Sequence, residues 1–383
     1  MSGKSDFIIT QLKVKNFRSL ADVDISLEPL TVFVGPNGAG KSNIVDSLRF
    51  VRDALIRGLD NSILERHGMS AMRRWSAKGR PFDVTIHLSI QGKNFFGEYG
   101  FTLGSERRGE YRVKWEKCSV TYKDRSEGYE YRSGEWIQPP TLIDRHERKP
   151  PPHLKTALYL STPFPMMEGQ YRLRRVLQDM GFYTIYPDTL REPQKPANPR
   201  PLDEKGQNLA AVLRDLKKRK RSNVQTMVEA LGKVTTGIRD FSVSQVGGYL
   251  VTRLHYGTGG PAFELAQESD GTLRVLGILS ALYQTPPRSL IAVEEPELTI
   301  HPGALGVLCD VLQETSSRSQ VVITTHSPDL IYHFPVEYLR VVEKVDGSTE
   351  VGPVAGHQRQ AITAKLFSPG ELMRMEGLQR ETN

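Results

Sequence analysis

The sequence is poor in cysteine, with only Cys118 and Cys309 among its 383 residues. Two thiols so far apart exclude a disulfide framework, give no metal-binding spacing and fit a reducing cytoplasm. No apolar run approaches the ~18 residues that a membrane-spanning helix needs. The first residues also lack the basic lead and apolar stretch of a secretory signal, so a cytoplasmic protein is expected. Internal repeats and long heptad runs are missing too, which excludes a solenoid and an extended coiled coil.

The composition is that of an ordinary globular protein with a sizeable core, at 38% hydrophobic and 25% charged residues. The formal net charge is +7. Much of the excess lies in the segment 213–221, where six basic residues accompany the single acid Asp215. Such a local concentration indicates an anionic partner for that segment. The basic residues are Arg214, Lys217, Lys218, Arg219, Lys220 and Arg221.

The first third of the chain has the pattern of a sheet interrupted by one helix. A compact β-rich run at 30–34 ends at glycine, and an apolar stripe follows at helical spacing over 42–55. Strict alternation of apolar and polar residues at 82–91 predicts a strand with one solvated face. Further strands are predicted at 12–17, 23–27, 111–122 and 129–137.

Proline clusters at 139–140 and 150–152 mark a change in organisation. From there to about residue 237 the pattern is mostly helical, which predicts an inserted helical subdomain. After strands at 241–246 and 249–255, short apolar strands alternate with helices, which predicts a parallel sheet covered on both faces. We therefore expect an α/β protein with a mixed sheet, whose antiparallel part is N-terminal. Its expected divisions are 1–138, 139–238 and 239–383.

A phosphate-binding loop is predicted at 35–42, where the sequence GPNGAGKS matches G-x-x-x-x-G-K-[ST]. Glycines allow successive backbone N–H groups to surround a phosphate, and the helix N-terminus adds partial positive charge. In such a loop Lys41 reaches the β- and γ-phosphates and the Ser42 hydroxyl binds Mg²⁺. The alternative is a glycine-rich turn with a chance lysine, which the strand before it and the helix after it disfavour.

Two further apolar strands end in residues suited to phosphate chemistry. The run 290–293 leads into Glu294 and Glu295, of which one can support Mg²⁺ and the other can orient or deprotonate water. The run 320–324 leads to His326, whose neutral imidazole could hold the γ-phosphate or the attacking water. The alternatives are an exposed acidic turn and a structural histidine. Ser269, before a predicted helix, suits either a helix N-cap or a second anion site.

These motifs in this order resemble the ABC-type ATPase heads of the RecF, SMC and OLD group. The N-terminal segment NFRSL at 16–20 also resembles that group, and other segments resemble stand-alone ATPases related to OLD proteins. Those segments are 182–183, 190–193, 206–209 and 366–378.

The resemblance implies ATP and Mg²⁺ as ligands and a role for each motif. Ser42 and Glu294 would serve the metal, Glu295 would be the general base, and His326 would be the switch histidine. Ser269 and Gly271 would act in trans on the nucleotide of a second copy, which makes the chain a nucleotide-dependent homodimer. The nucleotide-binding set would be Gly35, Asn37, Gly38, Gly40, Lys41, Ser42 and Asn43, together with Arg18.

The sequence departs from the group's pattern at several positions. Glu294 stands in place of the commoner Asp, and Asp270 adds negative charge to the signature segment. The glutamine that links nucleotide and lid has no clear counterpart, Gln91 being a poor candidate. The 57 residues after His326 lack the spaced acids of the OLD nuclease module, so a nuclease activity is expected from another chain.

The leading hypothesis is an ATP-hydrolysing dimeric switch that acts on DNA, or controls a partner nuclease or effector, in DNA repair or anti-phage defence. The basic run at 217–221, comprising Lys217, Lys218, Arg219, Lys220 and Arg221, would bind DNA, or else it is a solvated helix end. An ATP-dependent scaffold with little turnover is the second hypothesis. The nucleotide-binding subunit of a membrane transporter is the third.

Overall fold

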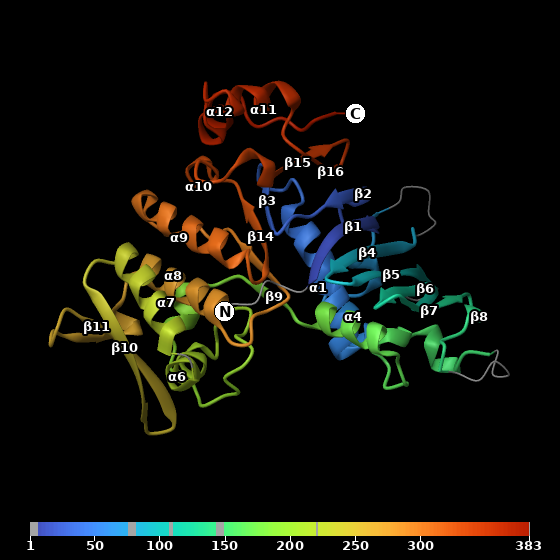
Figure 1. Ribbon diagram of the computed structural model, residues 1–383, viewed down its shortest axis with the longest axis horizontal. Coiled ribbons are helices and arrows are strands. Elements are labelled where there is room, and N and C mark those ends of the chain that lie inside the picture. The colour runs from blue at the N-terminus through green and yellow to red at the C-terminus, as the bar shows by residue number, and fades with distance from the viewer. Residues whose placement is uncertain (1–6, 76–81, 107–109, 143–148, 220, 383) are drawn as a thin grey trace.

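The computed structural model describes residues 7–75, 82–106, 110–142, 149–219 and 221–382. Their strands form three sheets (Figure 1). A mixed sheet lies at the centre, an antiparallel sheet lies to one side and a helical lobe to the other. In the described part of the chain, no helix is both long and apolar enough to cross a bilayer.

The antiparallel sheet is built from the N-terminal strands, as the sequence predicts. Its order is β2, β1, β4, β5, β6, β7, β8. Sequence reasoning missed β5, because three glycines break its apolar pattern. The single strand predicted at 129–137 is instead divided between β7 and β8, which pair antiparallel across a turn. A Cβ on Gly97 would lie 2.6 Å from Leu173 Cδ1, so this glycine lets a helix pack closely on the sheet. The bounds are β1 Phe7–Phe17, β2 Leu20–Ser26, β4 Val84–Gly92, β5 Phe95–Ser105, β6 Tyr111–Tyr122, β7 Arg125–Arg132 and β8 Glu135–Gln138.

The central sheet has the order β16, β15, β3, β14, β13, β9. β9, β13, β14, β3 and β15 run parallel and β16 is antiparallel. All residues of β3, β13 and β14 except the last of β13 are buried, which explains their unbroken apolar runs. The bounds are β3 Leu30–Val34, β9 Met180–Tyr183, β13 Leu290–Glu294, β14 Gln320–Thr325, β15 Leu339–Val345 and β16 Ser348–Gly352.

Each face of the central sheet packs against a different layer. Phe33 and Val322 belong to the core shared with α1 and the antiparallel sheet. Val32 and Ile323, on the opposite face, pack with the helices α6 to α9. This alternation follows from the two-residue period of a strand. The bounds are α1 Lys41–Arg57, α6 Leu209–Arg219, α7 Arg221–Val234, α8 Asp270–Tyr283 and α9 Pro302–Thr315.

The segment 139–238, expected to be one helical insert, is more divided than that. The helix α4 contacts α1 and β6, on the side of the antiparallel sheet. The strand β9 then joins the edge of the central sheet beside β13. A strand of four residues is too short to show a period, so its pattern did not predict it. Only α5 to α7 lie in the helical lobe. The remaining bounds here are α4 Glu168–Gln178 and α5 Pro187–Arg191.

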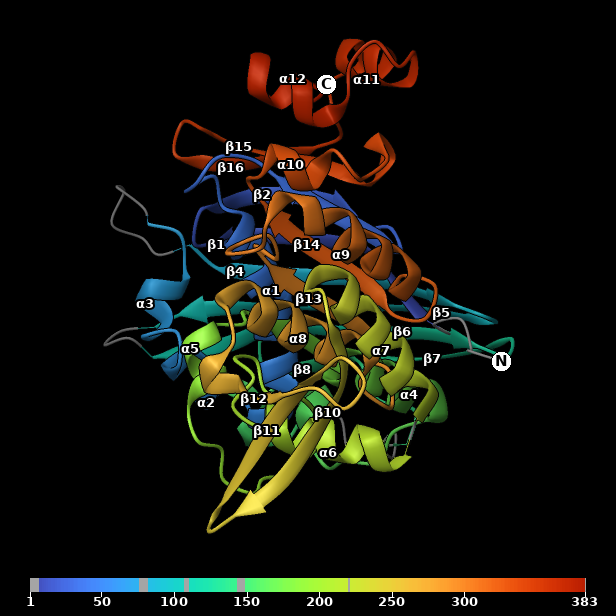
Figure 2. The same ribbon diagram turned by 90° about the vertical axis from the view of Figure 1, so that its left-hand side faces the viewer.

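The third sheet projects from the helical lobe as a long hairpin (Figure 2). The strands β10 and β11 form the hairpin, and β12 pairs with β11. A short 3-10 helix, Leu265–Gln267, then connects this sheet to α8. The C-terminal helices α11 and α12 lie at the far end of the molecule, beyond β15 and β16. The bounds are α2 Leu59–Leu64, α3 Met69–Met72, β10 Ile238–Val246, β11 Tyr249–Tyr256, β12 Ala262–Glu264, α10 Pro328–Ile331, α11 Gly356–Thr363 and α12 Pro369–Met375.

Gln320 joins the antiparallel sheet to the central sheet. Its buried side chain accepts a hydrogen bond from Ile9 N at 2.9 Å and donates to Ile9 O at 2.8 Å. It also donates to Glu28 O at 3.0 Å. These bonds satisfy backbone groups at the irregularity where the pairing of β1 and β4 shifts between Ile9 and Gln11.

Replacing this side chain should destabilise the protein. Gln320→Ala leaves the N–H and C=O groups of Ile9 buried without partners, at a cost of about 3 kcal/mol in unfolding free energy. Thermal unfolding followed by circular dichroism should show a clearly lower midpoint. Gln225→Ala, on the exposed face of α7, is the matched control and should leave the midpoint unchanged. Equal midpoints for the two variants would contradict this role.

Candidate functional site

The phosphate loop has the strand–loop–helix context that the sequence predicts. It connects β3 to α1. Gly38 has φ 78° and Gly40, the N-cap of α1, has φ 113°, which are values that favour glycine. A Cβ on Gly35 would lie 2.1 Å from Val342 O, so this glycine allows β15 to approach. The loop therefore leads into the N-terminus of α1, where the first N–H groups of a helix have no partner within that helix.

Lys41 lies buried inside the phosphate loop. Its Nζ donates to Gly35 O at 2.7 Å and to Pro36 O at 3.0 Å. Burial lowers the pKa of Lys41, and the nearby carboxylates of Glu295 and Glu297 oppose that change. The ammonium group is thus held by two carbonyl oxygens at the position where a phosphate would be bound.

A chain of hydrogen bonds holds the phosphate loop in place. Asn43 Nδ2 lies 2.7 Å from Ser19 Oγ, which lies 2.7 Å from Thr349 Oγ1. Thr349 Oγ1 in turn donates to Ala39 O at 2.7 Å. Because each hydroxyl has one proton, the bonds run in one direction from Asn43 to Ala39. Sequence reasoning missed Thr349, since nothing in β16 indicates that it packs against a loop 310 residues away.

Arg18 lies at the turn between β1 and β2, beside the phosphate loop. Its guanidinium is 3.1 Å from Asp46 Oδ2 on α1. Arg18, Ser42 and Glu294 line the same pocket, together with other basic and acidic side chains. The structure therefore brings Arg18 to the metal side of the predicted site, and ties it to α1 by an ion pair.

Glu294 is the last residue of β13 and is held by α1. Arg49 Nη2 donates to Glu294 Oε1 at 2.9 Å, and Thr184 Oγ1 lies 3.5 Å from the same oxygen. The anchored side chain offsets the freedom that the extra methylene of Glu would bring relative to Asp. Thr184 follows β9, at the point where the chain enters the helical lobe. It therefore lies beside the site, for which no lid glutamine could be identified in the sequence.

Glu295 and His326 come together, as predicted, from two neighbouring strand ends. Glu295 Oε1 is 3.3 Å from His326 Nδ1, and Glu295 N donates to Thr324 O at 2.9 Å. Glu295 has φ 45°, a left-handed conformation that is costly for this residue type. The surrounding bonds hold that strained turn, which directs the carboxylate toward His326 and the phosphate loop.

A buried arginine connects the helix α8 to this turn. Arg274 Nη2 donates to Glu295 O at 2.7 Å, and its side chain also donates to Ile185 O. Burial lowers the pKa of Arg274, and the carboxylates of Glu297 and Glu295 oppose the change. Arg274 is not singled out by the sequence, because it lies within an otherwise apolar helix.

The predicted signature residues lie at the start of α8, in the helical lobe. Ser269 is the N-cap of α8 and accepts from Thr272 N at 3.2 Å. A Cβ on Gly271 would lie 2.8 Å from Thr299 O, so the loop after β13 packs against this glycine. Arg191 forms an ion pair with Asp270 at 2.5 Å and so neutralises the extra charge of this segment. Within the described residues, neither Ser269 nor Gly271 forms a hydrogen bond to the phosphate loop.

The residues at the strand ends fit a polar ligand with a metal ion. Thr324 Oγ1 and Glu297 Oε2 are buried without a hydrogen-bond partner among the described residues. Those residues contain no group of three His, Cys, Asp or Glu side chains that could hold a metal ion alone. Mg²⁺ that enters with ATP suits this arrangement, because water and phosphate oxygens supply most of its ligands. Ser42 and Glu294 are the residues that would hold it, and it would neutralise phosphate charge.

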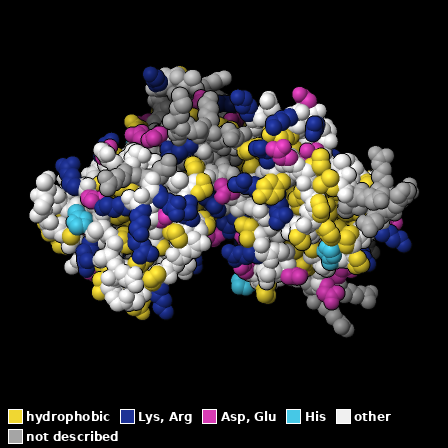
Figure 3. Space-filling view, turned by 60° about the horizontal axis from the view of Figure 1, so that its bottom comes forward, with side chains coloured by type: hydrophobic (Ala, Val, Ile, Leu, Met, Phe, Trp, Pro, Cys, Tyr) yellow, Lys and Arg dark blue, Asp and Glu magenta, His cyan; other side chains and the backbone are white. Residues whose placement is uncertain are grey.

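The basic run is partly neutralised within the chain. Lys217 forms an ion pair with Asp240 at 2.7 Å, and Arg219 forms one with Asp215 at 2.6 Å. Lys218 is exposed at the end of α6, and Lys220 lies outside the described residues. On the face shown in Figure 3, acidic side chains lie among the Lys and Arg side chains. This run is therefore less cationic than its sequence indicates.

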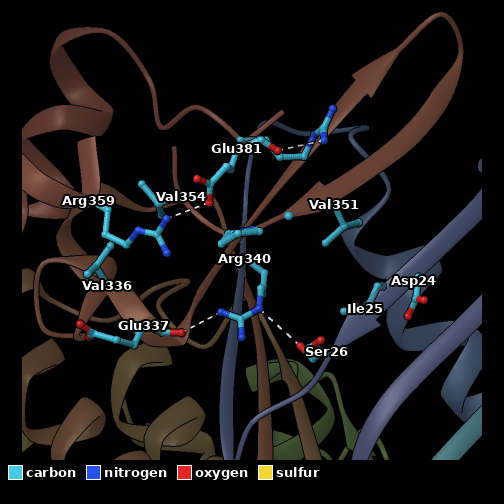
Figure 4. Close-up of a pocket in the computed structure, with 13 residues that line it drawn as sticks. Asp24, Ile25, Ser26, Val336, Glu337, Arg340, Val351, Val354, Arg359 and Glu381 are labelled. Atoms are coloured by element: carbon cyan, nitrogen blue, oxygen red, sulfur yellow. Dashed lines mark hydrogen bonds and ion pairs between the residues drawn. The ribbon is translucent and has the colours of Figure 1, made fainter. Parts of the chain in front are cut away.

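Two other features lie away from the site. Gln91 belongs to β4 in the antiparallel sheet, so it is not the lid glutamine. A pocket between β2, β15 and the C-terminal segment contains Arg340, which donates to Glu337 O and Ser26 O (Figure 4). Beside it, Arg359 is paired with Glu381 at 2.8 Å. These charges are engaged within the chain, and none of the lining residues belongs to the phosphate loop.

Comparison with known proteins places the chain among nucleotide-binding ATPases. Residues 30–331 match a family described as "AAA domain, putative AbiEii toxin, Type IV TA system". The OLD nuclease of Thermus scotoductus is 25% identical over an alignment of 351 positions, which covers 88% of this chain. The chain spans 62% of the length of that relative. RecF of Corynebacterium jeikeium, a DNA replication and repair protein, is 31% identical over 22% of this chain and 21% of its own length.

Solved structures of SMC heads have the same fold. An SMC head bound to the C-terminal winged-helix domain of ScpA has a TM-score of 0.55 at 16% identity. The match covers 92% of this chain and 99% of that SMC head. The Pyrococcus furiosus SMC head with an extended coiled coil has a TM-score of 0.52 at 14% identity, and it covers 94% of this chain and 99% of its own. The predicted ABC-type α/β fold is thereby confirmed.

Thr349 offers a test of the hydrogen-bonded support beneath the phosphate loop. Thr349→Val removes the hydroxyl between Ser19 and Ala39, and ATP affinity should fall by about tenfold, as for the loss of one net hydrogen bond. Titration of a fluorescent ATP analogue measures this change. Thr349→Ser keeps the hydroxyl and should bind like the wild type. If the valine variant bound equally well, the network would have no part in nucleotide binding.

Proposed function

The chain belongs to this AAA-domain family and to the ATPases of the OLD, RecF and SMC type. We therefore propose that it binds ATP and Mg²⁺ and hydrolyses ATP to ADP and phosphate. The observation that supports this most directly is the convergence of three strand ends. The phosphate loop after β3, the two acids after β13 and the histidine after β14 all lie at the carboxyl edge of one parallel sheet. That edge is where such sheets bind ligands.

The proposed roles follow from the contacts. Backbone N–H groups of the phosphate loop and Lys41 bind the phosphates. Glu295, held 3.3 Å from His326, takes a proton from the attacking water, while His326 holds the γ-phosphate or that water. Glu294, anchored by Arg49, supports the metal side of the site together with Ser42.

The proposed active unit is a homodimer that forms through ATP. The start of α8 forms no hydrogen bond to the phosphate loop of its own chain among the described residues, and the Ser269 side chain bonds within its own turn to Thr272. The partial positive charge of that helix N-terminus suits a γ-phosphate bound by a second copy. Each site would then be completed by two chains, and hydrolysis would separate them.

The proposed biological role is the control of DNA or of a partner nuclease, in repair or anti-phage defence. It rests on the names of the relatives, an OLD nuclease and a DNA repair protein. The exposed Lys218 and its neighbours are the proposed DNA contact. Because Lys217 and Arg219 are paired, we expect a weaker salt dependence of DNA binding than five free charges would give.

A scaffold that turns over ATP slowly is the second candidate. The ion pair between Arg49 and Glu294 favours it, because a neutralised acid attracts a metal ion less strongly. The same nucleotide-dependent dimer would then serve to hold an assembly together. The rate of hydrolysis by the wild type distinguishes the two.

Single substitutions should separate binding from hydrolysis. Lys41→Ala should lose ATP binding, whereas Glu295→Gln should bind ATP and hydrolyse it at least about 100-fold more slowly, because the base is missing. Release of inorganic phosphate and titration with a fluorescent ATP analogue measure the two properties. Equal rates in the wild type and both variants would contradict an ATPase function.

Mixing two inactive variants should restore activity if the site is shared. Lys41→Ala cannot bind ATP, and Ser269→Arg cannot complete its partner's site. A mixed dimer has one intact site, made from Lys41 of one chain and Ser269 of the other. With random pairing, an equimolar mixture should recover about a quarter of the wild-type rate. No recovery, with both variants folded and Ser269→Arg still binding ATP, would contradict the composite site.

A further inference from the structure

A third carboxylate lies at the predicted catalytic edge. Glu297 follows the strained turn at Glu295, and 9% of its surface is exposed. Its Oε1 accepts a hydrogen bond from Thr325 Oγ1 at 2.5 Å. Thr325 ends β14 and pairs with Val34, the last residue before the phosphate loop. Glu297 therefore lies between the base of that loop and the two strand ends with Glu295 and His326.

The bond from Thr325 gives the carboxyl group a fixed orientation. Thr325 Oγ1 also accepts from Ser327 N at 2.9 Å, so its single proton is directed to Glu297. One chain of bonds thus joins the loop after β13 to the turn that contains His326. The side chain of Glu297 cannot rotate without breaking this chain.

The second carboxyl oxygen is unused. Glu297 Oε2 is buried and has no hydrogen-bond partner among the described residues. Burial raises the pKa of Glu297, while its bond to Thr325 and the nearby His326 lower it, and Glu295 raises it. Lys41 and Arg274 also lie within electrostatic reach. All these neighbours belong to the proposed site, so the unpaired oxygen lies among the groups that would surround a bound nucleotide.

We propose that Glu297 Oε2 accepts a hydrogen bond from the water that attacks the γ-phosphate. This inference rests on the proposed ATPase function and adds a catalytic residue to it. A water molecule has two protons, and two carboxylates would fix both of them. Its oxygen lone pair would then point at phosphorus, which is an orientation that one acceptor alone does not impose.

The reaction balances with Glu295 as the only base. The water oxygen forms a bond to the γ-phosphorus, and the bond from that phosphorus to the β–γ bridging oxygen breaks. The bond's electron pair leaves on ADP. One water proton passes to Glu295, and the other stays on the product phosphate, hydrogen-bonded to Glu297.

The variant Glu297→Gln tests the proposal. Its amide can still accept from Thr325 through oxygen, but the group facing the water becomes a donor. We expect kcat to fall by about 10- to 100-fold, with the dissociation constant of a fluorescent ATP analogue within about twofold of wild type. Glu314→Gln, on the exposed side of α9, is the control and should match the wild type.

The pH profile of kcat separates this role from a merely structural one. In the wild type Glu297 must be ionised to accept from the water, and burial raises the pKa of its carboxyl group above the ordinary value. Glu297→Gln has no carboxyl group to titrate at this position, so the acid limb of the kcat profile should move to lower pH. A structural defect would lower the thermal midpoint and ATP affinity without moving the limb.

A second pair of variants covers the case in which Glu297→Gln does not fold. Thr325→Val removes the bond that orients Glu297 and should lower kcat, whereas Thr325→Ser keeps the hydroxyl and should not. Unchanged kcat and pH limb in Glu297→Gln, with Glu295→Gln inactive, would overturn this inference and leave the ATPase intact. Equal kcat in the two Thr325 variants would also overturn it. A wild type without ATP turnover would overturn the proposed function itself.

Discussion

The parallel pairing of β3, β14 and β13 is the constraint on which the candidate site depends. The register places Thr325 beside Val34 and Glu294 beside Thr324, so three strands end at one level. Backbone hydrogen bonds fix that register, and both faces of the strands are buried. A slip of one residue would turn every side chain to the other face. The phosphate loop and the acids therefore come together although no hydrogen bond joins them directly among the described residues.

Side chains from distant elements hold the charged residues around the site in place. Arg49 of α1 anchors Glu294, and Arg274 of α8 binds the carbonyl of Glu295. These contacts connect the phosphate-loop helix and the start of the signature helix to the same turn. A change at either helix would reach the turn with the proposed catalytic carboxylate through one residue, because buried ion pairs and hydrogen bonds tolerate little displacement.

Much of the fold could be predicted because its elements have strong local patterns. The β-rich run predicted before the phosphate loop has the same bounds as β3, and the strand predicted at 111–122 has the same bounds as β6. The misses have physical reasons. The glycines of β5 interrupt its apolar pattern, and β9 is only four residues long. The central parallel sheet was predicted from 290–293 and 320–324, but its edge strand β9 lay hidden in a segment expected to be helical.

The sequence by itself determined the phosphate loop, the acids at 294 and 295, and His326, because each lies next to a strand or helix whose pattern is local. Tertiary structure alone decided which residues support them. Thr349 fixes the phosphate loop from 310 residues away, and Glu297 is oriented by a hydroxyl on the neighbouring strand. Such contacts depend on strand register and on burial. Neither can be read from residue spacing, because packing brings together segments that share no local pattern.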